Sequence, residues 1–240
     1  MARGTMYLGR MLSFGQLHDA EVSNRMSRAW AKFNAHRKEL CNKHFHLSHR
    51  LRFFQAVITP SALYSAGTWT MTAGRERILR SMQRKMLRII VNVRRTTVSS
   101  GDSTSSNTDD EDEDCDEDDE SHLEPWLLWM TRATSLSEEM ARKHGICDWV
   151  EDQRRRKWRL AGHMARRNDG RWATKLLVWF PTFGFRSRGH PSMRWGDVLV
   201  DFHKSVYGDG HGTWIETAQD RSTWSLLEDG FIDRCFLTNC

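Results

Sequence analysis

The sequence predicts a mainly α-helical chain, with two modules at residues 1–97 and 122–240 separated by a disordered acidic linker over 98–121. Apolar residues recur at three- to four-residue steps over long stretches, as on the buried stripe of an amphipathic helix. Glycine and proline stand near the ends of these stretches, where helices stop. Between the two modules the periodicity disappears, and Ser, Asp and Glu replace the apolar residues.

Helices are expected in the first module over 16–40, 48–58 and 75–93, with a short helical piece at 61–69. The helix over 48–58 is expected to stop at Thr59-Pro60, because helical backbone is disfavoured before proline. The helix over 75–93 combines an apolar face with a cationic face made of Arg77, Arg80, Arg84, Lys85 and Arg88. These cations are candidate phosphate contacts, and a plainly solvated helix face is the competing interpretation.

The segment over 98–121 carries 12 acidic residues between positions 101 and 120 and no Lys or Arg there. Such a stretch cannot bury enough apolar surface to offset its ordering entropy, so it predicts a disordered linker. An alternative is that the acidic tract folds back on the basic helices as a nucleic-acid mimic.

In the second module, helices are expected over 123–143, ending at His144-Gly145, and over 148–167, closed by Gly170. The run 171–180 is helix or strand, and 181–190 is a loop. A further helix runs from Pro191 to about Val206, and glycines at 208, 210 and 212 mark a turn. Asp220 is expected to cap a last helix.

The charge distribution predicts a polyanionic partner. Residues 1–100 carry 18 basic and 4 acidic side chains, although the whole chain has a net charge of only +5. Such a polycation attracts polyphosphates or anionic membranes. No apolar run is long enough for a membrane span, and no signal peptide is evident. The five scattered cysteines predict reduced thiols in an intracellular protein.

The sequence contains no phosphate-binding glycine loop, no GxSxG, no HExxH and no paired Cys-x-x-Cys motif. Asp197 and Asp201 share a helix face, but solvent-facing carboxylates are the favoured interpretation. We therefore predict no catalytic residue and no cofactor. A weak zinc candidate, and with it a metal-dependent nuclease as a rival function, is the set Cys41, His44, His46 and His49.

A second basic stretch, RRRKWRLAGHMARRNDGRW at 154–172, interleaves cations with indole rings, as nucleic-acid-binding surfaces do. Its RRRK run also matches a nuclear import signal, which predicts a nuclear location. For the indoles, burial in a core helix is the competing interpretation. The candidate binding residues here are Arg154, Arg155, Arg156, Lys157, Trp158, Arg166, Arg167, Arg171 and Trp172.

Several motifs occur together in the order found in LINE-type (non-LTR) retrotransposon reverse transcriptases. Tyr7-Leu8-Gly9, RLRFFQAVITPSALYSAGTW and LRSMQRKMLRIIV resemble the thumb of these enzymes. RRRKWRLAGHMARRNDGRW, RSRGHPSMRWGDV and WIETAQDRSTWSLLEDGF are similar to the segment behind the thumb. Ser65 and Val198 depart from the Gly and Asp that are usual at their positions.

The resemblance implies a helical thumb-like bundle, descent from an RNA-directed DNA polymerase, and RNA or DNA as partners. The parent enzyme uses Mg²⁺ and a Tyr-x-Asp-Asp strand of the palm, which in the family precedes the YLG step. That Asp pair is absent from this sequence, so no catalytic residue is carried over. We expect a nucleic-acid-binding fragment without polymerase activity. The alternatives are an interaction protein whose acidic tract binds basic partners, and a retroelement relic without function.

Overall fold

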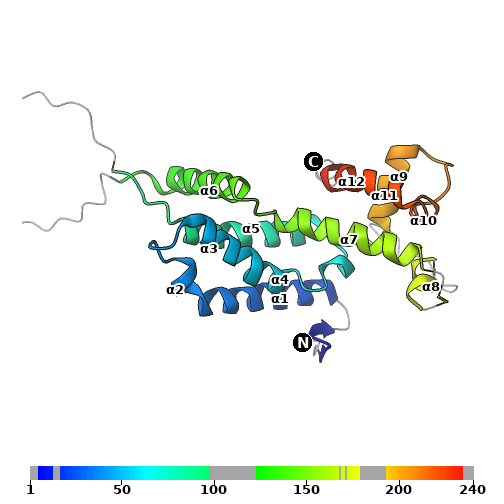
Figure 1. The fold of residues 1–240 in the computed structure, drawn as a ribbon, viewed down its shortest axis with the longest axis horizontal. Helices are drawn as coiled ribbons and strands as arrows, with labels where there is room; N and C mark the ends of the chain where they lie inside the picture. Colours follow the sequence, from blue (N-terminus) through cyan, green and yellow to red (C-terminus); the bar gives the residue numbers. More distant parts are fainter. Residues whose placement is uncertain are drawn as a thin grey trace, which may run out of the picture.

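The computed structural model describes residues 5–12, 17–97, 123–167, 169–170, 172–178 and 193–234. Within these residues the chain is mainly helical, which confirms the predicted fold class (Figure 1). The expected linker at 98–121, the loop at 181–190 and the helix start at Pro191 lie outside them. The elements are β1 (Thr5–Tyr7), β2 (Arg10–Leu12), α1 (Leu17–Ala35), α2 (Arg37–Leu40), α3 (Leu47–Phe53), the π-helical turn η1 (Phe54–Ile58), α4 (Thr59–Ala62), the 3₁₀ turn η2 (Ala66–Thr68), α5 (Ala73–Val91), α6 (Trp126–Lys143), α7 (Trp149–Ala165), α8 (Trp172–Val178), α9 (Asp197–Tyr207), α10 (Trp214–Thr217), α11 (Arg221–Leu226) and α12 (Glu228–Arg234).

A β-hairpin precedes the helices and was not predicted from the sequence. Strands β1 and β2 pair antiparallel through a turn at Leu8 and Gly9, whose φ angles are +45° and +78°. The Arg25 guanidinium donates to the Gly9 carbonyl, and the Tyr64 hydroxyl donates to the Leu8 carbonyl at 3.2 Å. Leucine is a poor residue for a left-handed turn position, so the turn lacked its usual Asn-Gly or Asp-Gly signal.

The expected helix stop at Thr59-Pro60 is wrong. Helix α3 passes through η1 into α4 without a break, and Pro60 lies in the first turn of α4. Pro60 directly follows the π-helical turn, where the regular i to i−4 ladder is already interrupted, because the Thr59 N–H donates to the Phe54 carbonyl five residues back. Two other expected helices are divided: 16–40 breaks at His36 into α1 and α2, and the last helix breaks at Leu227 into α11 and α12.

The first hydrophobic core joins α1, the α3–η1–α4 segment and α5 to parts of α6 and α7. Phe33, Phe54 and Trp69 lie at its centre and are fully buried. The Trp149 ring of α7 stacks on Phe54, with 5.9 Å between the ring centroids. Trp149 also donates its indole N–H to the Thr59 hydroxyl at 3.1 Å, so the ring is buried with its polar atom satisfied.

A second hydrophobic core packs the C-terminal half of α7 against α9–α12. Its centre is a pair of parallel indoles, Trp158 and Trp224, whose centroids are 3.6 Å apart. Each indole donates its N–H to the other residue's backbone carbonyl, Trp158 at 2.9 Å and Trp224 at 3.2 Å. Phe231 packs against Trp158 from α12 at 4.8 Å.

The boundary between the two cores does not coincide with the expected linker at 98–121. Ala141, Ile146 and Trp149 follow that segment in the sequence, yet they belong to the first core. Helix α7 passes from one core to the other, and Figure 1 shows it running from the side of α5 toward α8 and α10. The cores therefore meet within a continuous helix.

The residues directly before and directly after the acidic segment are paired with each other. Thr97 forms an isolated antiparallel bridge with Leu123, and the Glu124 N–H donates to the Thr96 carbonyl at 2.8 Å. The Glu124 carboxylate pairs with Arg132 at 2.5 Å. This pairing with the Arg132 guanidinium lowers the pKa of Glu124 to about 2, so Glu124 remains ionised at any physiological pH.

Candidate nucleic-acid interface

Four of the cations predicted to contact phosphate line one groove beside α5. Arg77, Arg80, Arg84 and Arg88 are spaced three or four residues apart, which places them on one side of the helix. The groove has a volume of about 500 Å³. The remaining lining residues are Ala73, Glu76, Ser81 and, from α6, Thr134. We call this surface the arginine groove.

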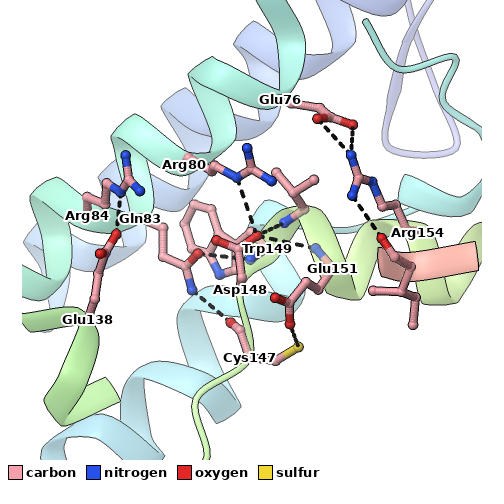
Figure 2. Close-up of polar contacts among 12 residues, drawn as sticks. Glu76, Arg80, Gln83, Arg84, Glu138, Cys147, Asp148, Trp149, Glu151 and Arg154 are labelled. Atoms are coloured by element: carbon pink, nitrogen blue, oxygen red, sulfur yellow. Dashed lines mark hydrogen bonds and ion pairs between the residues drawn. The ribbon is translucent and has the colours of Figure 1, made fainter. Parts of the chain in front are cut away.

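Acidic side chains from neighbouring elements face Arg80 and Arg84 of this row (Figure 2), and a hydroxyl of α6 faces Arg88. The Arg84 guanidinium lies 2.5 Å from the Glu138 carboxylate of α6, and Arg80 lies 3.9 Å from Asp148, which caps α7. Arg88 donates to the Thr134 hydroxyl at 2.9 Å. Burial, followed by the nearby Arg84, lowers the pKa of Arg88 from its usual range, but a guanidinium stays charged at neutral pH.

Lys85 does not join the groove. Its ammonium group lies 5.5 Å from the centre of the Trp30 ring of α1, an attractive contact between a cation and an aromatic face. Lys85 is exposed, but it is not among the residues that line the groove.

The structure corrects three predicted contacts in the second basic stretch. Arg154, Lys157 and Trp158 are at most 3% exposed, so they cannot contact a nucleic-acid backbone. Trp158 is the centre of the second core, and Lys157 lies 5.2 Å from the Trp195 ring. Arg154 points into the interior, where it pairs with Glu76. Burial, the competing interpretation for the indole, is correct for Trp158.

The other described arginines of this stretch bind parts of the protein itself. Arg155 lies 3.5 Å from Glu228, Arg156 lies 3.0 Å from Asp152, and Arg167 lies 3.8 Å from Asp169. Arg166 donates to the Ala218 carbonyl at 2.9 Å. Arg155 and Arg166 therefore tie this part of the chain to α12 and to the end of α10, whereas Arg156 and Arg167 pair with nearby residues of the sequence.

At the end of the same stretch, Trp172 is 76% exposed, with the Lys175 ammonium 5.3 Å from its ring centre. An exposed ring beside a cation suits base stacking, but it lies on α8 and does not line the arginine groove. Arg171 lies outside the described residues.

The weak zinc candidate has no counterpart in the described part of the chain. The Cys41 thiol is directed at the Ile89 carbonyl, 3.9 Å away, and the His46 ring caps α3 by accepting from the Ser48 N–H. Among the described residues, no three His, Cys, Asp or Glu side chains gather as metal ligands would. His44 lies in a turn, His46 is the N-cap of α3, and His49 lies in the first turns of α3.

Sequence reasoning found the arginines of the groove but missed the residues that face them. Thr134 and Glu138 come from α6, and only the packing of α6 beside α5 brings Thr134 to the groove and Glu138 to Arg84. Asp148 carried a usable signal, because an Asp directly before a helical run predicts an N-cap. Its proximity to Arg80 could not be derived from that signal.

No helix in the described residues combines the length and apolarity that a membrane crossing requires. No known protein-family profile matches the chain, and no solved structure matches it. The sequence is similar to a Caenorhabditis elegans protein described as transposon-derived. The two are 25% identical over 221 residues, which is 91% of this chain and 67% of that protein.

Proposed function

We propose that this chain descends from a transposon and binds the sugar–phosphate backbone of RNA or DNA through the arginine groove. Four guanidinium groups in one groove are the observation that carries the proposal. The C. elegans relative, described as transposon-derived, supports the descent. The motifs shared with LINE-type reverse transcriptases support the finer assignment to a polymerase thumb region.

The groove has the chemistry of a backbone-binding site. Arginine binds phosphate through a planar fork of N–H donors, and contacts to phosphate need no base sequence. Arg88 lies 11 residues after Arg77 on the same helix. At about 1.5 Å per residue this is roughly 16 Å, or about five steps of a duplex at about 3.4 Å each.

The proposed role is binding without catalysis by this chain. We assign no residue to a chemical step, and Mg²⁺ belongs to the intact polymerase that the resemblance implies. A nuclear location would follow from a chromosomal target.

Replacing Arg77 or Arg84 with glutamine is expected to weaken binding to an RNA–DNA hybrid about five- to tenfold each, because each variant loses one charge-assisted phosphate contact. The measurement is fluorescence anisotropy with a labelled hybrid and with a single strand, across a salt series. The slope of log K against log salt should become shallower by about 1 for each variant.

Matched controls are Arg28→Gln in α1 and Arg52→Gln in α3, both exposed and neither lining the arginine groove. They should change affinity much less. Absence of binding by the wild-type chain at low salt would refute the proposal. Equal losses in the control and groove variants would mean that binding follows overall charge and that the groove is not the site.

A further inference from the structure

We propose that the carboxylates of Glu138 and Asp148 compete with nucleic-acid phosphates for Arg84 and Arg80 of the arginine groove. On binding, Arg84 and Arg80 exchange these carboxylates for phosphates of the nucleic acid. This inference rests on the proposed function, and it makes these two acids, which contact groove arginines without lining the groove, a brake on affinity.

The ion pair between Arg84 and Glu138 can separate at little cost in free energy. Its side chains are 46% and 36% exposed, so water can solvate both charges when they separate. Exposed pairs of this kind contribute little stability. The Arg154–Glu76 pair differs, because its side chains are only 3% and 12% exposed, so separating them would take a buried guanidinium away from its carboxylate.

Asp148 can release Arg80 without losing its other partners. Its carboxylate accepts from the Val150 N–H at 2.7 Å and the Glu151 N–H at 3.3 Å, at the start of α7. Arg80 lies farther away, at 3.9 Å. The positive end of the helix dipole also favours the carboxylate at this position. Asp148 therefore stays fixed beside the groove after Arg80 turns to another anion.

Two carboxylates that remain beside the arginine row must repel an incoming phosphate. They come from α6 and from the start of α7, whereas the arginines come from α5, so the cations and the two competing acids stand on different elements (Figure 2). Removing either acid leaves the arginines in place and removes one repulsion and one competing partner. Affinity should then rise.

The test uses variants that remove only charge. Glu138→Gln preserves the side-chain shape, and Asp148→Asn preserves the helix cap because asparagine also caps helices well. Each variant is expected to bind the RNA–DNA hybrid about three- to tenfold more tightly at low salt. The salt dependence should steepen by up to about 1.

Two controls match these changes away from the groove. Glu139→Gln alters the exposed neighbour of Glu138 on α6. Asp220→Asn alters an aspartate that caps α11 with the same pattern, accepting from Ser222 N–H at 3.0 Å and Thr223 N–H at 3.3 Å. Both controls should bind as the wild type does. The gain from Glu138→Gln should shrink by at least half in an Arg84→Gln background, because the competition acts through Arg84.

The outcomes separate this inference from the proposed function. If the wild type binds and Arg84→Gln weakens binding, but Glu138→Gln and Asp148→Asn bind no better than their controls, the competition is refuted and the groove assignment stands. If no variant binds at low salt, both proposals fail. Unfolding temperatures within about 2 °C of wild type would show that an affinity change does not reflect altered folding.

Discussion

Replacing Glu76 with alanine is expected to lower the free energy of unfolding by about 3–5 kcal/mol. Both oxygens of the Glu76 carboxylate accept from the same Arg154 nitrogen, Nη2, at 2.8 and 2.9 Å. Arg154 is 3% exposed and also donates to the Ile232 carbonyl of α12 at 3.0 Å. Without Glu76, a guanidinium charge is left in the interior with its strongest partner removed. The measurement is thermal and urea unfolding followed by circular dichroism.

Glu138→Ala is the control, because it removes a carboxylate from an exposed pair and should cost no more than about 1 kcal/mol. The double variant Glu76→Leu with Arg154→Met removes both charges together. It should recover much of the loss, since apolar side chains of similar size can replace a buried ion pair. Equal effects of Glu76→Ala and Glu138→Ala would contradict the structural role assigned to the buried pair. A chain without a cooperative transition would favour the relic interpretation.

Replacing Gly162 with alanine is expected to destabilise the protein by a net of about 2 kcal/mol, although alanine favours helices over glycine. A Cβ at Gly162 would lie 2.7 Å from Trp224 Cδ1, well inside normal contact. Trp224 cannot move aside freely, because it is stacked on Trp158 and bonded to its carbonyl. The expected fall in unfolding temperature is about 4–8 °C for a chain of this size.

The matched control is Gly74→Ala in the first turn of α5, where the nearest atom to an added Cβ is 3.9 Å away. This change should be neutral or stabilising by up to about 1 kcal/mol. If Gly162→Ala unfolded at the temperature of the Gly74 variant, close contact between α7 and Trp224 would not explain the glycine of the Ala-Gly-His step.

Local signals predicted the long helices, although not all of their ends. The three- to four-residue apolar spacing anticipated α1, α5, α6 and α7, and Asp220 caps α11 as expected. Gly145, with φ at +70°, ends α6 where a left-handed residue was expected. Each of these features depends on neighbours a few positions apart, which a sequence displays directly.

The candidate site was predictable only in part, because burial of a charged side chain depends on distant residues. Arg77 and Lys157 are equally basic in the sequence, yet Arg77 is exposed beside a groove and Lys157 is covered by the second core. What decides between them is the packing of α9–α12 over α7, and no local pattern encodes it. The same holds for Arg154, whose partner Glu76 lies 78 positions away.

The bridge between Thr97 and Leu123 has a consequence for how this gene product can change over time. Because Thr97 and Leu123 are paired with each other, residues can be gained or lost between these two positions without shifting the register of any described helix. The entropic cost of such growth rises slowly, by about 0.6 kcal/mol for each doubling of length. Thr97 and Leu123 thus mark a natural insertion point, at which a polyacidic stretch could accumulate while both hydrophobic cores kept their packing.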